Sequence, residues 1–100
     1  MGRPVNRLRA VHPGEMLRKE YLAPLNLSVN AIAMALEVPA TRIHEIVRKR
    51  RGITADTAEL LPHYFGGDAA PWLALQANYD LKMLATREDI ARRLAPRAHA

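Results

Sequence analysis

The sequence contains no cysteine in its 100 residues, which excludes disulfide bonds and any zinc site with cysteine ligands. Aromatic residues make up only 5%, so a core must consist mainly of leucine, isoleucine, valine and alanine. No apolar run approaches the ~20 residues that cross a bilayer, and the N-terminal MGRPVNRLRAV lacks the apolar stretch of a signal peptide. We therefore expect a soluble protein of the reducing cytoplasm.

What the sequence does contain is material for one small core and an uneven distribution of charge. Apolar residues make up 49%, and a chain of 100 residues is long enough for one domain. Residues 1–52 hold ten Lys/Arg against four Asp/Glu, whereas residues 53–100 hold five against six. The first half would attract a polyanion such as DNA, although a basic, solvated surface without such a partner would look the same.

Proline, glycine and small polar residues divide the first half into helical segments. His12-Pro13 is expected to start the first helix, because proline is favoured at the first helical position, and Pro24 is expected to stop it. Ser28 suits the N-cap of a second helix. Pro39 is expected to begin a third, which Gly52 ends.

The second half continues this helical pattern. Thr54 is expected to cap a fourth helix that runs to about Phe65, with a kink at Pro62. Gly66-Gly67 marks the next stop, before a fifth helix over about residues 70–85 and a short last helix within residues 86–100. Strand-like alternation is missing, so the sequence predicts an all-α bundle of five to six helices over residues 12–85. Residues 1–11, with Arg3, Arg7 and Arg9, are expected to be a flexible basic arm.

The second and third helices, about residues 28–49, have the spacing of a helix-turn-helix. A small residue at the crossing point and apolar residues at the junction would let the helices pack closely; these are Ala33, Leu36, Val38, Ile43 and Ile46. Glu37 occupies the turn position that commonly holds a left-handed glycine. We expect it to cost about 1 kcal/mol there, unless the turn has another shape.

The outward side of the third helix suits the edges of base pairs in the major groove of DNA. Arginine can fork onto guanine, glutamate can accept from cytosine, and small residues can meet a thymine methyl group. The expected base-reading residues are Ala40, Thr41, Arg42, His44 and Glu45, and the expected phosphate contacts are Ser28, Asn30, Arg48, Lys49, Arg50 and Arg51. The alternative is an ordinary solvated helix with an apolar stripe.

Other chemistry is poorly supported. The pair His44-Glu45 resembles the start of a zinc-protease motif, but the second histidine that the motif needs is replaced by Arg48. His12, His44, His63 and His99 are scattered, which indicates isolated surface histidines rather than a metal site. We expect no catalytic site, metal or cofactor.

The fifth helix carries more apolar residues than one small core needs. Trp72, Leu75, Tyr79 and Met83 share a face. The simplest interpretation assigns them to the core. We expect both roles: one edge of the helix packs inward and another edge meets a second subunit, with Trp72, Leu75, Tyr79 and Met83 as the expected dimerisation residues.

Three stretches together resemble the HigA-type antitoxins, a branch of the lambda-repressor-like (Cro/XRE) helix-turn-helix proteins. They are "HPGE" at residues 12–15, "RGITADTA" at residues 51–58 and "WLALQANYDL" at residues 72–81. The resemblance implies a homodimer that binds a palindromic operator, represses its own operon and neutralises a HigB-type ribonuclease toxin. The sequence departs from the family pattern at Glu59, Pro62 and His63. Two alternatives stay open: a solitary regulator without a toxin, and a toxin-neutralising module that binds DNA weakly.

Overall fold

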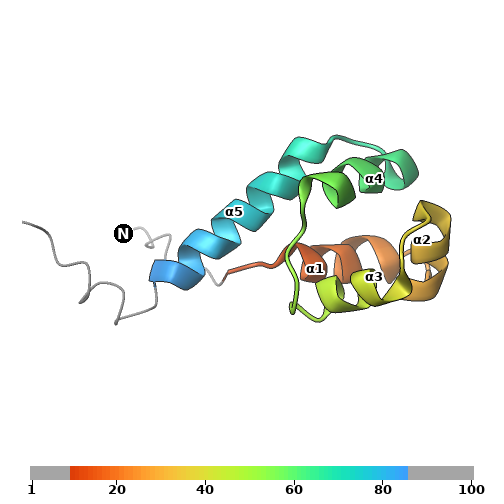
Figure 1. The fold of residues 1–100 in the computed structure, drawn as a ribbon, viewed down its shortest axis with the longest axis horizontal. Helices are drawn as coiled ribbons and strands as arrows, with labels where there is room; N and C mark the ends of the chain where they lie inside the picture. Colours follow the sequence, from red (N-terminus) through yellow and green to blue (C-terminus); the bar gives the residue numbers. More distant parts are fainter. Residues whose placement is uncertain (1–9, 86–100) are drawn as a thin grey trace, which may run out of the picture.

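The computed structural model describes residues 10–85, which form only helices and connecting turns. The elements are α1 (Pro13–Met16), η2 (Leu17–Leu22), α2 (Val29–Leu36), α3 (Ala40–Val47), α4 (Ala55–Phe65) and α5 (Ala69–Ala85), as Figure 1 shows. The predicted all-α fold is confirmed. The expected last helix and most of the expected basic arm lie outside the described residues.

The first helix, α1 continued by the π-helical η2, starts and ends where the sequence predicts. The His12 imidazole caps it, because Nδ1 accepts a hydrogen bond of 2.8 Å from the Gly14 N–H. His12 is buried at 2% exposure, so the expectation of a surface histidine was wrong for this residue. The helix ends at Leu22 with Ala23 as its C-cap, directly before Pro24, which has no N–H to continue the helical hydrogen bonds.

The helix-turn-helix consists of α2, a tight turn and α3. The Ser28 hydroxyl caps α2 by accepting the Ala31 N–H at 2.9 Å. Glu37 takes the left-handed conformation, with φ 58° and ψ 43°, and the following Val38 N–H donates to the Ala33 carbonyl at 3.0 Å. The turn therefore keeps its usual glycine geometry with a glutamate in the left-handed position.

The end of α3 also has a left-handed residue, and it differs from the predicted end at Gly52. Lys49 is left-handed, with φ 64°, and the Arg50 N–H donates to the Glu45 carbonyl at 2.8 Å. Gly52 lies beyond this capping turn, so the helix does not end at the glycine. A lysine thus occupies the position that glycine fills most easily.

The start of α4 also differs in detail from the prediction. The Thr54 hydroxyl donates to the Asp56 carboxylate and makes no capping bond to the helix, whereas the Thr54 carbonyl accepts the Ala58 N–H at 2.9 Å. The helix runs through Pro62 to Phe65. The predicted stop at Gly66-Gly67 is confirmed, since both glycines have positive φ, 87° and 90°.

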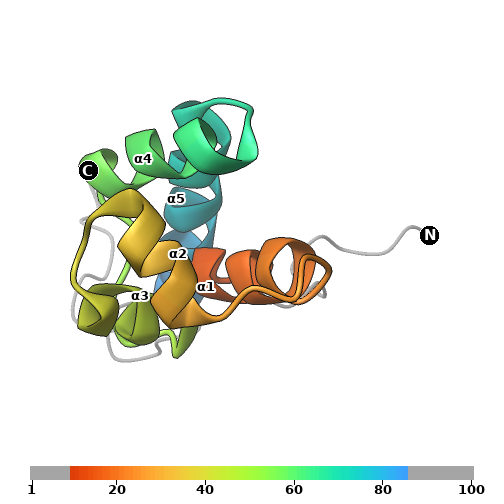
Figure 2. The same cartoon turned by 90° about the vertical axis from the view of Figure 1, so that its right-hand side faces the viewer.

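The helices pack around one hydrophobic core, which the helix-turn-helix shares with the first helix, α4 and α5. In Figure 2 α2 lies between α4 and α3, and α5 runs behind them. The core contains Leu17, Leu22, Ile32, Ala33, Leu36, Ile43, Ile46, Ile53, Ala58, Leu61 and Trp72. Figure 1 shows the C-terminal part of α5 extending away from the other helices. Within the described residues, every helix is too short or too polar to cross a membrane.

Close helix packing explains Gly14 of the "HPGE" stretch. A Cβ atom added at this residue would lie 1.8 Å from the Ile46 carbonyl oxygen and 2.9 Å from the Val47 Cα. The absence of a side chain therefore lets α1 contact the backbone of α3 directly. The position of α3 depends on this contact.

Candidate nucleic-acid interface

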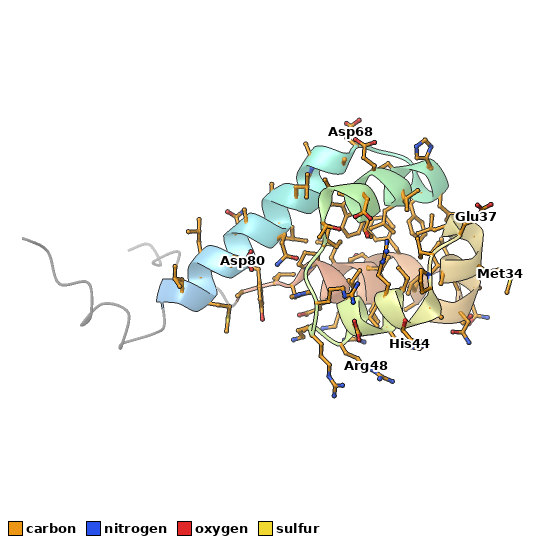
Figure 3. All side chains as sticks on the ribbon, viewed as in Figure 1. Met34, Glu37, His44, Arg48, Asp68 and Asp80 are labelled. Carbon is orange, nitrogen blue, oxygen red and sulfur yellow. The ribbon has the colours of Figure 1, made fainter. Side chains whose placement is uncertain are left out.

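The third helix, α3, buries one side and presents the other. Ile43 and Ile46 are 0% and 1% exposed and anchor α3 in the core, as the sequence predicts. Thr41 is exposed and Arg42 is partly exposed, whereas Ala40 packs partly against the core and offers less surface than expected. In Figure 3 the side chains of His44 and Arg48 point away from the body of the molecule on this outer side.

Neighbouring polar groups hold the outward side chains of α3. Arg42 Nη1 lies 3.3 Å from Asp56 Oδ2 in α4, and Glu45 Oε1 lies 2.9 Å from Arg51 Nη2. The partners in both pairs are between 29% and 61% exposed, and ion pairs this open contribute roughly 0–1 kcal/mol. Ion pairs of this strength therefore do not prevent the outward side chains from contacting DNA.

The two helices of the helix-turn-helix share one polar surface. His44 Nε2 lies 3.3 Å from Asn30 Oδ1, which joins the outer side of α3 to the first turn of α2. Ser28 and Asn30 are both exposed at this end of α2, where backbone N–H groups face outward. The structure thus brings His44, one of the expected base-reading residues, next to Asn30, one of the expected phosphate contacts.

The four consecutive cations after α3 differ in their surroundings. Arg48, Lys49, Arg50 and Arg51 are all exposed. Lys49 Nζ lies 3.8 Å from Glu15 Oε1, and Lys19 Nζ lies 3.1 Å from Oε2 of the same carboxylate. The Glu15 side chain is only 6% exposed, and this largely buried carboxylate of α1 forms an ion pair with Lys49, just after the end of α3.

One carboxylate and one imidazole have pKa values that this packing shifts. Hydrogen bonds from the Thr54 hydroxyl and the Thr57 N–H, with a smaller effect of Arg42, hold the pKa of Asp56 below its ordinary value. Burial lowers the pKa of His12, and nearby Lys49 lowers it further, against opposing effects of Asp80 and Glu15. Asp56 is therefore an anion and His12 is neutral near pH 7.

The comparisons with known proteins bear on this helix-turn-helix. No family model matches the sequence. Virulence-associated protein I of Dichelobacter nodosus is 62% identical over 78 residues, which is 78% of this chain and 72% of that protein. The Pseudomonas aeruginosa antitoxin HigA, solved with the higBA promoter, superposes with a TM-score of 0.83 at 37% identity, covering 92% of this chain and 100% of that one. The chain belongs to the HigA family of helix-turn-helix proteins.

Another protein of known structure has the same fold. PA4674 of Pseudomonas aeruginosa, solved in complex with its operator DNA, has a TM-score of 0.76 at 40% identity and covers 90% of this chain and 99% of that one. The HigA resemblance stated from "HPGE", "RGITADTA" and "WLALQANYDL" is therefore confirmed at the level of the family.

The expected dimer face of this HigA-family chain needs correction. Trp72 is 6% exposed and lies against the Tyr21 ring at a centroid distance of 5.2 Å, and Tyr79 lies 4.8 Å from the His12 ring. Leu75 is partly buried, and Met83 is 43% exposed. The apolar side chains that α5 leaves open are instead Leu73, Leu81 and Leu84, at 37%, 64% and 46% exposure. Trp72 belongs to the core because it closes the contact between α5 and the first helix.

The sequence pattern alone does not reveal the partners of the polar surface. Glu15 and Asp56 lie in the first turns of α1 and α4, where an acidic residue is already favourable at the helix start. Their contacts with Lys49 and Arg42 depend on how α1 and α4 pack against α3, and charge patterning within single helices carries no signal for them. Among residues 10–85, the structure contains no cluster of three acidic or histidine side chains that could hold a metal.

Proposed function

We propose that this chain is a sequence-specific DNA-binding antitoxin, which represses its own operon as a homodimer and neutralises a HigB-type ribonuclease toxin. One observation carries the proposal: α3 is anchored by Ile43 and Ile46 and turns a polar surface outward, in a chain of the HigA family. Two relatives that share this fold were solved with promoter or operator DNA.

The geometry supports entry of α3 into the major groove, which is about as wide as one α-helix. Arg42 donates to guanine O6 and N7, Glu45 accepts from the cytosine amino group, and His44 donates or accepts according to its tautomer. Thr41 and the exposed part of Ala40 contact a thymine methyl group. These side chains read the sequence.

The phosphate contacts surround this surface. The backbone N–H groups at the start of α2, near Ser28 and Asn30, face one phosphate. Arg48, Lys49, Arg50 and Arg51 follow α3 where the chain leaves the groove, and they position the protein without selecting a sequence. Of these, Lys49 contributes least, because Glu15 already neutralises part of its charge.

Pairing of two subunits through α5 completes the proposal. The exposed leucines Leu73, Leu81 and Leu84, with Met83 beside them, form the apolar surface that a second copy covers. A two-fold axis at this surface places two α3 helices about one DNA turn apart, which matches a palindromic operator.

A gel-shift titration tests the DNA-binding part. The probe is the duplex upstream of the chain's own reading frame, measured at several salt concentrations beside a scrambled duplex. Arg42→Ala is expected to cost about 1–3 kcal/mol and to relax one base position, while Arg48→Ala weakens both duplexes alike and reduces the salt slope by about one. Equal affinity for both duplexes together with a flat salt dependence overturns the proposal, because neutralised phosphates must release counterions.

Toxin neutralisation is a separate part with a separate test. The small protein encoded beside this chain is expected to co-purify with it and to lose its ribonuclease activity. The second candidate function is a solitary regulator, favoured by the 33% identity over 84 residues with the Escherichia coli HTH-type transcriptional regulator YbaQ. Operator binding without a co-purifying partner would favour this second function, and a captured toxin without operator preference would favour the toxin-binding module.

A further inference from the structure

An ion pair joins the outer side of α3 to the start of α4. Arg42 Nη1 and Asp56 Oδ2 are 3.3 Å apart, and the two residues lie in the first turns of their helices. Their side chains are 29% and 61% exposed, so the pair sits on the surface of the proposed DNA interface rather than in the core.

The Asp56 carboxylate is itself held in place. Its Oδ1 atom accepts from the Thr54 hydroxyl and from the Thr57 N–H, the latter at 2.8 Å. Both bonds use the same oxygen, so Oδ2 remains to face Arg42. Asp56 is therefore a fixed acceptor beside a long side chain that would otherwise sample many rotamers.

The arrangement leaves Arg42 able to bind a base. A guanidinium has five N–H donors, of which the contact with Asp56 uses one on Nη1. The remaining donors suffice for the two acceptors of guanine, O6 and N7. A side chain that is ordered before binding loses less entropy when it binds, and a neighbouring anion makes the same guanidinium a poorer ligand for phosphate.

On this basis we propose that Asp56 is a specificity-determining residue, which positions Arg42 for a guanine edge and holds it back from the phosphate backbone. The inference rests on the proposed DNA-binding function. It assigns base selectivity to a residue of α4, outside the helix-turn-helix. The simpler role for Asp56, an anion that stabilises the N-terminus of α4, affects stability but leaves base preference unchanged.

Selection from a randomised duplex library tests the two roles. The purified full-length protein, Arg42→Ala, Asp56→Asn and Asp56→Glu each select from the same 20-base-pair pool. The matched control is Asp68→Asn, which removes the same charge from the exposed loop before α5, on the opposite side of the molecule from His44 and Arg48 in Figure 3. Asparagine keeps the Oδ1 acceptor for Thr54 and Thr57 and replaces only the oxygen that faces Arg42.

Arg42→Ala is expected to lower the preference for guanine at one position by roughly 5- to 150-fold, the discrimination of a lost bidentate contact. Asp56→Asn lowers the preference at that same position by about two- to fivefold, as expected for loss of an exposed ion-pair partner. It also strengthens binding to duplexes outside the consensus. Asp56→Glu restores part of the preference, and Asp68→Asn keeps the wild-type profile.

Failure of the inference can be told apart from failure of the proposed function. If the wild type selects a consensus that Asp56→Asn leaves unchanged, or changes at another position than Arg42→Ala does, only the role of Asp56 is overturned. If the wild type selects no consensus, both are overturned. NMR relaxation of the Arg42 Nε–Hε group gives a readout without DNA. This group is expected to be more mobile in Asp56→Asn than in Asp68→Asn, and equal mobility overturns the inference.

Discussion

Replacement of Gly14 by alanine is a sharp test of how α1 fixes α3. Gly14 lies within α1, where alanine would ordinarily stabilise a helix by up to about 1 kcal/mol. In this structure the added methyl group would lie 1.8 Å from the Ile46 carbonyl oxygen and 2.6 Å from its carbonyl carbon. The packing therefore predicts the opposite sign from the helix propensity.

The size of the effect follows from what must move. Real Cβ atoms stay more than 3.0 Å from such neighbours, so α1 and α3 must separate by more than 1 Å at a contact formed by backbone atoms. Overpacking of this kind costs about 1–3 kcal/mol, occasionally more. For a domain of this size a loss of ~3 kcal/mol lowers the melting temperature by roughly 12–24 °C.

Urea denaturation followed by circular dichroism measures this loss. Asn78→Ala is the control, because it also introduces an alanine into a helix but at an exposed position. We expect Gly14→Ala to lose at least 1 kcal/mol more than Asn78→Ala. An unchanged or raised free energy of unfolding for Gly14→Ala would refute the packing of α1 on α3.

Three further predictions concern single contacts. The pKa of His12 is lowered in the folded chain, so the unfolded chain takes up a proton at a higher pH, and the free energy of unfolding falls as the pH drops below about 6.5. His12→Asn keeps an acceptor for the helix cap and removes the titrating group. This variant should flatten the pH dependence in unfolding titrations between pH 7.5 and 5. Glu37→Gly should raise the free energy of unfolding by about 0.5–1 kcal/mol, because glycine relieves the left-handed strain at φ 58°; a loss of stability would show that the glutamate side chain matters more. Gln76→Ala should lower the free energy of unfolding by about 1–3 kcal/mol, because it removes the acceptor of the Ile53 N–H. Asn78→Ala, on the exposed side of α5, is the control. Equal losses for the two variants would contradict this role of Gln76.

Much of the fold could be predicted because local signals and packing agree. Ser28 caps α2, the two isoleucines of α3 point into the core, and Gly66-Gly67 separates α4 from α5, each for the reason that the sequence suggests. The helix ends were less predictable. Glu37 and Lys49 adopt left-handed conformations that glycine would adopt more readily, because the helices on either side determine the path of the chain.

The candidate site was predicted residue by residue but not contact by contact. Exposure of Thr41 follows from helical periodicity, and exposure of Arg48 and the following cations, which come after α3, follows from their charge. The pairing of Arg42 with Asp56 does not, since the two residues are 14 positions apart and belong to different helices. The assignment of Trp72 to a dimer face failed for a related reason: periodicity identifies an apolar face but not the neighbour that covers it.

The hydrogen bond between Ile53 and Gln76 has a consequence for measurement. The Ile53 N–H donates to Gln76 Oε1 at 2.8 Å, and Ile53 itself is 5% exposed, so this amide exchanges with deuterium when the Gln76 side chain leaves it, when α5 detaches or when the domain opens. It lies two residues after Arg51, in the segment that leaves α3. The exchange rate of this one backbone proton thus reports how often the contact between α5 and the segment after α3 opens. The measurement needs no label on α5 or on that segment.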